Sequence, residues 1–131
     1  MNRKLKIVVA DDERDTREYL QDYLSRIGYD VRAAEDGRQL VELCHAFGPD
    51  LVVTDYAMPG LNGLAAATEA NRDRAVPVIL ISGRHDVESL AQAEGSCVVR
   101  FLAKPVKELE LRAAVEAALR NATALKATLE K

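Results

Sequence analysis

Five short apolar runs alternate with amphipathic segments along the chain, and this alternation limits the folds that it can adopt. The apolar runs predict strands over 5–10, 29–34, 51–54, 77–81 and 97–103. The segments between them predict helices over 14–27, 36–46, 63–72 and 86–94, and a fifth helix that begins at about Val106. Strands that alternate with helices form parallel sheets with right-handed crossovers. We therefore predict an α/β fold, a doubly wound sheet of five parallel strands.

Length and composition narrow the class of protein further. The chain has 131 residues, which is enough for one domain with its own core and too few for two ordinary ones. A formal net charge of −3 and the lack of tryptophan argue against direct binding to nucleic acid, which relies on Lys, Arg and stacking aromatics. No segment has the length of a membrane span or of a signal-peptide core, so we expect a cytoplasmic protein without membrane attachment.

The cysteines and histidines carry no recognisable motif. Cys44 and Cys97 lack a CxxC spacing, and we expect reduced, mostly buried thiols, with a disulfide between them as the minor alternative. His45 and His85 have no metal-ligand partners at a useful spacing, so we expect them at the surface or its boundary.

Polar residues follow four of the predicted strands at the point where each strand ends. They are Asp11 and Asp12, Asp55, Ser82, and Lys104. In a doubly wound sheet of order 2-1-3-4-5, the first and third strands are neighbours at the switch point where ligands bind. Each residue also has a structural interpretation: the Asp pair could cap the first helix, Asp55 could start a turn, and Ser82 and Lys104 could be ordinary surface residues. Their shared position at one edge of the sheet favours a common site.

The chemistry of these side chains is complementary. Three carboxylates gathered without a cation would repel one another and raise their own pKa values. Oxygen ligands with room for water suit Mg²⁺, which removes that cost. A lysine and a hydroxyl next to such a cation are suited to a phosphoryl group, whose transfer depends mainly on positioning and charge stabilisation.

Four motifs carry a family resemblance: VVADDE, VVTDYAMPGLNG, VILISG and FLAKP occur in this order. The chain resembles the receiver domain of a two-component response regulator, of the single-domain type found in chemotaxis regulators, and the resemblance spans residues 5 to about 120. It implies a flavodoxin-like (βα)5 fold. It also implies that Asp55 accepts a phosphoryl group from a histidine kinase or a histidine phosphotransfer protein. The chain would then catalyse only its own phosphorylation and dephosphorylation.

The resemblance also assigns the other residues of the site. It implies that Mg²⁺ is held by Asp12 directly, by Asp11 through water, by Asp55 and by the backbone carbonyl of Ala57. Ser82 and Lys104 match the hydroxyl and the lysine of the family, and a cis peptide bond is expected before Pro105. In the family, the positions of Ala57 and Arg84 tune the lifetime of the phosphate.

A conformational switch is the expected consequence of phosphorylation. The resemblance implies that Ser82 moves toward the phosphate and that Phe101 turns inward, which alters the surface of the fourth helix, fifth strand and fifth helix. The alternative for Phe101 is an aromatic residue of the core or of the sheet edge.

The C-terminal stretch contains neither Gly nor Pro after Val106. We expect a receiver domain over 1–121 and a helical extension over 122–131. Apolar residues alternate spacings of four and three, as in coiled coils, at Leu111, Val115, Ala118, Ala122, Leu125 and Leu129. Two interpretations remain open: a fraying amphipathic end, which we favour, and a helix that forms a homodimer or leads toward an effector domain outside this sequence. The surface of the fourth helix, fifth strand and fifth helix is a second possible homodimer interface.

Two other functions compete with the receiver hypothesis. A metal-dependent phosphohydrolase with an Asp nucleophile usually has a second Asp two residues later, where this chain has Ala57, and a cap domain for which there is no length. An interaction module that works without phosphorylation would not need the complete set of acidic, hydroxyl and lysine residues. We therefore favour the phosphoacceptor.

Overall fold

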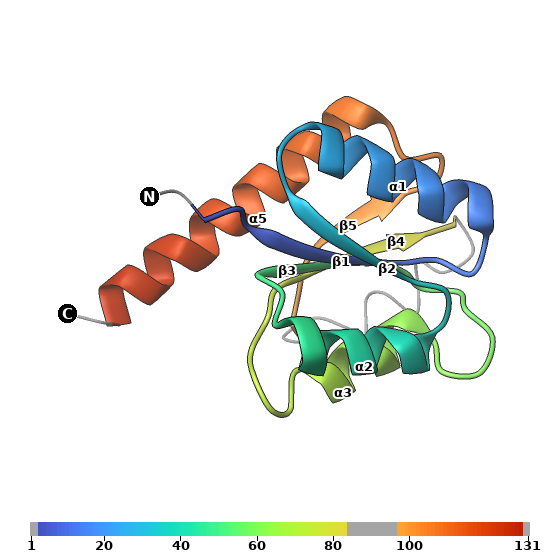
Figure 1. Ribbon diagram of the computed structural model, residues 1–131, viewed down its shortest axis with the longest axis horizontal. Coiled ribbons are helices and arrows are strands. Elements are labelled where there is room, and N and C mark those ends of the chain that lie inside the picture. Colours follow the sequence, from blue (N-terminus) through green and yellow to red (C-terminus); the bar gives the residue numbers. More distant parts are fainter. Residues whose placement is uncertain (1–2, 84–96, 130–131) are drawn as a thin grey trace.

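The sheet is all-parallel and has the predicted strand order. The computed structural model describes residues 3–83 and 97–129, with side chains as far as Asn121. In this part of the chain, five strands form one sheet in the order β2-β1-β3-β4-β5 (Figure 1). They are β1 (Lys6–Ala10), β2 (Asp30–Ala34), β3 (Leu51–Asp55), β4 (Val78–Ser82) and β5 (Val98–Ala103). The predicted flavodoxin-like α/β fold is thereby confirmed.

Helices cover both faces of the sheet. Figure 1 shows α1 (Arg14–Arg26) and α5 (Glu108–Leu129) on one face, and α2 (Gly37–Phe47) and α3 (Gly63–Ala70) on the other. The predicted bounds differ from these by at most two residues at either end. The helix expected over 86–94, together with Arg84 and His85, lies outside the described residues.

The core explains why the central strands are apolar without interruption. Successive side chains of a strand point to opposite faces. Ile7 and Val9 therefore join the core under α1 and α5, whereas Val8 and Ala10 join the core under α2 and α3. All four are completely buried. A sheet covered on both faces favours apolar residues at nearly every position of its central strands, because neither face meets water.

Local capping signals position the helices. The Asp36 side chain accepts a hydrogen bond of 2.8 Å from the Gln39 N–H at the start of α2. The Asn62 side chain accepts one of 2.8 Å from the Ala65 N–H at the start of α3. Glu13 is the N-cap residue of α1 and makes no such bond with its side chain. Asp11 and Asp12 are therefore not the N-cap residue of this helix.

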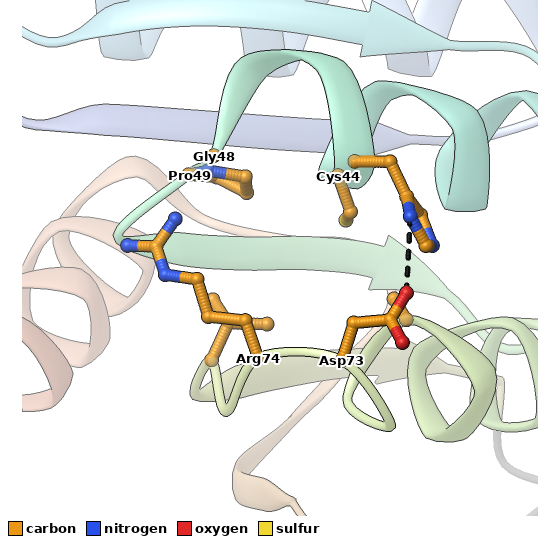
Figure 2. Close-up of a pocket in the computed structure, with 8 residues that line it drawn as sticks. Cys44, Gly48, Pro49, Asp73 and Arg74 are labelled. Carbon is orange, nitrogen blue, oxygen red and sulfur yellow. Dashed lines mark ion pairs between the residues drawn. The ribbon is translucent and has the colours of Figure 1, made fainter.

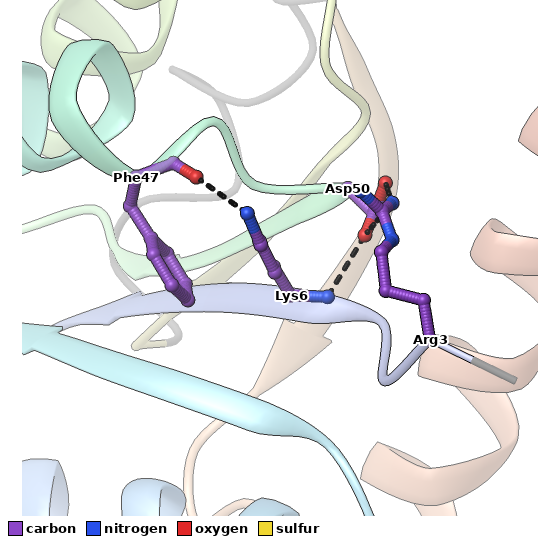
Figure 3. Close-up of polar contacts among 4 residues, drawn as sticks. All are labelled: Arg3, Lys6, Phe47 and Asp50. Carbon is purple, nitrogen blue, oxygen red and sulfur yellow. Dashed lines mark hydrogen bonds and ion pairs between the residues drawn. The ribbon is translucent and has the colours of Figure 1, made fainter.

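The amino-terminal edge of the sheet has its own set of contacts, drawn in Figure 3. Asp50 accepts a hydrogen bond of 2.8 Å from the Lys6 N–H and pairs with Arg3 at 3.2 Å. The Lys6 ammonium donates to the Phe47 carbonyl at 3.3 Å. Outside this view, the Arg32 guanidinium lies 4.8 Å from the centre of the Phe47 ring. These contacts join the start of β1 to the connection between α2 and β3.

The last helix continues beyond the sheet. With 22 residues, α5 is about 33 Å long, and Figure 1 shows its C-terminal half projecting past the edge of the sheet near the N-terminus. The predicted seam beyond Asn121 stays a prediction, because those side chains are not described. No helix in the described ranges is long and apolar enough to cross a membrane.

The two cysteines agree with the expectation. Cys44 and Cys97 are free thiols, and most of the surface of each residue is buried. Cys44 lies in the last turn of α2 and Cys97 immediately before β5, and each packs at the margin of the second core. His45 is exposed, as predicted, and pairs with Asp73 at 3.2 Å.

Candidate functional site

The ends of the strands bring the predicted carboxylates together. Asp11 follows β1 directly, and Asp55 is the last residue of the adjacent β3. One side-chain oxygen from each of Asp11, Asp12 and Asp55 lies within 4.8 Å of the other two. The parallel register produces this cluster, because Ala10 pairs with Thr54 at the same level of the sheet.

Asp55 is a buried carboxylate with a cationic partner. Only 2% of its surface is exposed, and the Lys104 ammonium lies 3.1 Å from its Oδ2 atom. The following residue, Tyr56, donates its backbone N–H to the Ile81 carbonyl at 2.8 Å. That bond extends the pairing of β3 with β4 beyond the strand and holds the Asp55 backbone in place.

Asp11 has one satisfied and one unsatisfied oxygen. Its Oδ1 atom accepts a hydrogen bond of 2.9 Å from the Glu13 N–H. Its Oδ2 atom is buried and finds no hydrogen-bond partner among the described residues. Asp12, in contrast, is exposed. A buried carboxylate oxygen without a partner is costly, and a cation would remove that cost.

The pKa values of the two buried carboxyl groups indicate that the site lacks positive charge. Burial raises the pKa of Asp11 to about 6, with further contributions from the charges of Asp55 and Asp12 and opposition from the Glu13 N–H. Burial also raises the pKa of Asp55, against the opposing hydrogen bond and charge of Lys104. Burial alone would lower the pKa of Lys104, but the hydrogen bond and charge of Asp55 raise it above its ordinary value. Lys104 therefore stays charged.

Ser82 and Lys104 reach the site from neighbouring strands. Ser82 ends β4, is buried and pairs with Ala103 of β5. The Lys104 N–H donates to the Ser82 carbonyl at 3.0 Å. The peptide bond between Lys104 and Pro105 is cis, as expected from the resemblance. The hydroxyl and the ammonium thus come from adjacent strand ends at the same edge as the carboxylates.

The donor set fits a hard divalent cation. Carboxylate oxygens of which one is buried and unpaired, next to an exposed carboxylate that solvent reaches, match the preference of Mg²⁺ for oxygen ligands and retained water. Ala57, whose carbonyl is a predicted ligand, lies exposed in the loop after Asp55. Its backbone N–H forms a hydrogen bond with the Asp55 carboxylate that lowers the pKa of that carboxylate.

Phe101 lies outside the core. It pairs with Leu80 in the sheet, and 41% of its surface is exposed. This exposure excludes a core aromatic and leaves two interpretations, the switch position and an aromatic residue of the sheet edge, since β5 is an outer strand.

Two polar contacts at the site are not evident from the motifs. The Thr54 hydroxyl is fully buried and donates to the Asp55 carbonyl at 3.0 Å, and Arg17 donates to the Asp11 carbonyl at 3.0 Å. A lone threonine in an apolar strand was a signal that could have indicated the first contact. The second depends on the approach of α1 to the strand end.

A separate hollow lies at the opposite edge of the sheet. It has a volume of about 150 Å³ and lies between the end of α2 and the connection from α3 to β4, where Cys44 and Arg74 line it (Figure 2). Burial raises the pKa of the Cys44 thiol to about 11, so the reactive thiolate is scarce at neutral pH. This hollow shares no lining residue with the carboxylate site.

Comparisons with known proteins agree with this geometry. The sequence model of the response regulator receiver domain matches residues 7–116. A probable transcriptional regulator, ycf27 of Galdieria sulphuraria, is 35% identical over 121 residues, which are 92% of this chain and 48% of the relative. The response regulator MprA of Mycolicibacterium vanbaalenii is 34% identical over 120 residues, which are 91% of this chain and 52% of the relative. The chain thus spans about half the length of the curated relatives that it matches.

Solved structures give the same result. A response regulator receiver domain protein from Clostridium thermocellum superposes with a TM-score of 0.84 at 28% identity, covering 92% of this chain and 98% of that chain. NtrX from Brucella abortus superposes with a TM-score of 0.90 at 29% identity, covering 98% of this chain and 29% of NtrX. Family match, fold and site agree, and the chain belongs to the response regulator receiver domains of two-component signal transduction.

Proposed function

We propose that this domain takes up a phosphoryl group on Asp55 from a phosphohistidine of a histidine kinase or a phosphotransfer protein. The observation that carries the proposal is the Asp55 carboxylate itself, buried among two further carboxylates and 3.1 Å from the Lys104 ammonium. A carboxylate without a cationic neighbour would be a poorly placed acceptor, because the incoming group is itself anionic.

The transfer requires little from the protein beyond positioning. An Asp55 oxygen forms the new bond to phosphorus while the bond from phosphorus to the donor nitrogen breaks, and the leaving imidazole takes up a proton from water. Lys104 neutralises charge on the phosphoryl oxygens, and the Ser82 hydroxyl donates a hydrogen bond to one of them. Bound Mg²⁺, held by Asp11, Asp12, Asp55 and the Ala57 carbonyl, supplies further neutralisation of the phosphoryl charge. The phosphoryl group later leaves by hydrolysis, in which water attacks phosphorus, the bond to the Asp55 oxygen breaks and inorganic phosphate is released. The chain catalyses both its phosphorylation and this dephosphorylation on itself alone.

The signal leaves the site through Ser82 and Phe101. Ser82 shifts toward the phosphoryl oxygens, and Phe101, which is 41% exposed without them, turns inward. This change alters the surface of β5 and α5 and of the helix predicted over 86–94. Phosphate favours a conformer that already exists in the ensemble, and full conversion from a rare state requires about 5 kcal/mol of differential binding.

The partners follow from the receiver role. We place the receiver domain at 1–121 and a helical extension at 122–131, with dimerisation through α5 or through the surface of the fourth helix, β5 and α5 as the proposed assembly. The relatives are about twice as long, and two of them carry names of transcriptional and response regulators. This domain, with its net charge of −3, would act in the cytoplasm on other proteins rather than on DNA.

The test is incubation with acetyl phosphate and Mg²⁺, followed by intact mass measurement. The wild type should gain one phosphoryl group, and Asp55→Asn should gain none, whereas Asp22→Asn, on the exposed side of α1, should behave as the wild type does. No adduct and no response to beryllofluoride would refute the proposal and favour an interaction module. Rapid turnover of many phosphate esters without a stable adduct would favour a phosphohydrolase.

A further inference from the structure

Two glycines adjoin the β3–α3 loop, residues 56–62, more closely than any other residue type allows. A Cβ atom on Gly63 would lie 2.9 Å from the Asp55 carbonyl carbon and 3.1 Å from the Thr54 hydroxyl, and it would overlap the Asp55 carbonyl oxygen. A Cβ atom on Gly37 would lie 2.9 Å from the Leu61 Cβ and would overlap the Leu61 carbonyl oxygen. Neither glycine has a positive φ angle, so close approach is what requires glycine at both positions.

The position of Gly37 next to the loop is fixed by its surroundings. It is the first residue of α2 and is buried. The Asp36 cap holds this end of the helix, and Leu40, one turn further along, is completely buried in the second core. Figure 1 shows α2 and α3 next to each other on the same face of the sheet, so the contact with Leu61 joins α2 to the segment that leads into α3.

Hydrogen bonds and packing anchor the loop at both of its ends. At the first end, the Tyr56 carbonyl accepts hydrogen bonds from the Met58 N–H at 3.1 Å and from the Gly63 N–H at 2.9 Å. At the other end, Leu61 packs against the second core and abuts Gly37. Ala57 lies between these two anchor points and is exposed, so the position of its backbone depends on them.

We propose that Gly37, acting through Leu61, is a positioning residue for the cation site. The inference rests on the proposed function, in which the Ala57 carbonyl is a ligand of Mg²⁺. Mg²⁺ tolerates little deviation from octahedral geometry at its short metal–oxygen distances. A side chain at position 37 displaces the Leu61 backbone, and the displacement moves the loop that carries Ala57. Residues that orient ligands from outside the coordination sphere typically change metal affinity by about 10- to 100-fold.

A purely structural glycine would give a different result. Replacing it would lower the stability of the fold, but the molecules that remain folded would bind Mg²⁺ as before. Metal affinity of the folded domain therefore separates the two roles, whereas stability alone does not.

The experiment compares Gly37→Ala, Leu61→Gly and Leu24→Ala with the wild type. Circular dichroism without metal defines a temperature at which each variant is folded, and calorimetric titration with Mg²⁺ at that temperature gives the dissociation constant. Leu24→Ala is the matched control, because Leu24 is a completely buried residue of α1 in the other core. Gly37→Ala should weaken Mg²⁺ binding by about tenfold, Leu61→Gly should weaken it in the same direction, and Leu24→Ala should leave it unchanged despite its lower stability.

Each outcome decides the question. If Gly37→Ala does not fold, Leu61→Gly provides the test, because it removes the side chain that anchors the loop next to Gly37 and introduces no steric clash. Unchanged Mg²⁺ affinity in the folded variants would overturn the positioning role and leave the proposed function intact. A wild type that binds no Mg²⁺ would overturn the proposed function and this inference with it.

Discussion

Replacing Asp11 by Asn should make the metal-free domain more stable, although the change removes a residue of the cation site. The Oδ1 atom of the new amide still accepts the Glu13 N–H, which Asp11 accepts at 2.9 Å. The amide nitrogen replaces Oδ2, which is buried and has no hydrogen-bond partner among the described residues. It can donate to a neighbouring carboxylate, so the substitution removes a charge and creates a donor where acceptors are in excess.

The size of the effect follows from the pKa of Asp11. Burial raises this pKa from 3.8 to about 6, so the folded state binds more protons than the unfolded chain between these two values. Stability without metal therefore falls as the pH rises through this window and stays lower above it. At about 1.4 kcal/mol per pKa unit, the penalty at neutral pH is at most about 3 kcal/mol, and solvent near Asp12 reduces it, so we expect a gain of about 1–3 kcal/mol.

The assay is urea unfolding with a chelator present, followed by circular dichroism at neutral and at mildly acidic pH. Asp11→Asn should unfold at higher urea concentration than the wild type at neutral pH, and the difference should shrink on acidification as Asp11 of the wild type takes up its proton. Mg²⁺ should then stabilise the wild type more than the variant, because binding to the folded state adds to its stability. The control is Asp22→Asn, which removes one exposed charge and should change stability by less than about 0.5 kcal/mol.

Two results would refute this reasoning. A variant less stable than the wild type in chelator would mean that the Asp11 carboxylate contributes more through its hydrogen bond than its burial costs. An advantage that stayed constant with pH would mean that the titration of Asp11 is not its source.

Three further predictions concern residues around the site. Lys104→Met should slow phosphorylation by acetyl phosphate by about 10²-fold, measured by intact mass, whereas Lys107→Met, at an exposed lysine nearby, should leave the rate unchanged. Equal rates for the two variants would contradict a role for the 3.1 Å pair of Lys104 with Asp55. Gly63→Ala should lower the free energy of unfolding by roughly 1–3 kcal/mol and slow phosphorylation, because the Cβ of the alanine meets the Asp55 backbone. Wild-type values in urea unfolding and in the mass assay would show that the loop adapts without cost. Asn62→Ala and Asp36→Ala should each cost about 1 kcal/mol in urea unfolding, since each removes a capping hydrogen bond of 2.8 Å, and no loss in either would contradict these caps.

The strands and helices were predictable because their signals are local. The run over 78–81 is apolar at every position because the strand is covered on both faces, and Asp36 and Asn62 cap helices within three residues of themselves. The site was predictable for a related reason. In a parallel sheet all strands end at one edge, so acidic and basic residues that follow different strands must meet there. Asp11, Asp55 and Lys104 could thus be brought together before any coordinates were known.

Properties that depend on distant packing could not be predicted in this way. The contacts of Lys6 with Phe47 and Asp50 and the exposure of Phe101 each depend on which segments lie beside them in the fold. The interpretation of Asp11 and Asp12 as helix caps was likewise open in the sequence, and the position of Glu13 at the start of α1 excludes it.

The sequence alone determined the order of the elements, the parallel sheet and the residues that share its carboxyl edge, because these follow from periodicity and from the direction of the strands. The tertiary structure decided that one Asp11 oxygen is buried without a partner among the described residues and that Gly37, at the start of α2, abuts Leu61 of the β3–α3 loop. The physical reason is that desolvation and steric fit depend on atoms contributed by remote segments, and no local pattern of residues encodes those atoms.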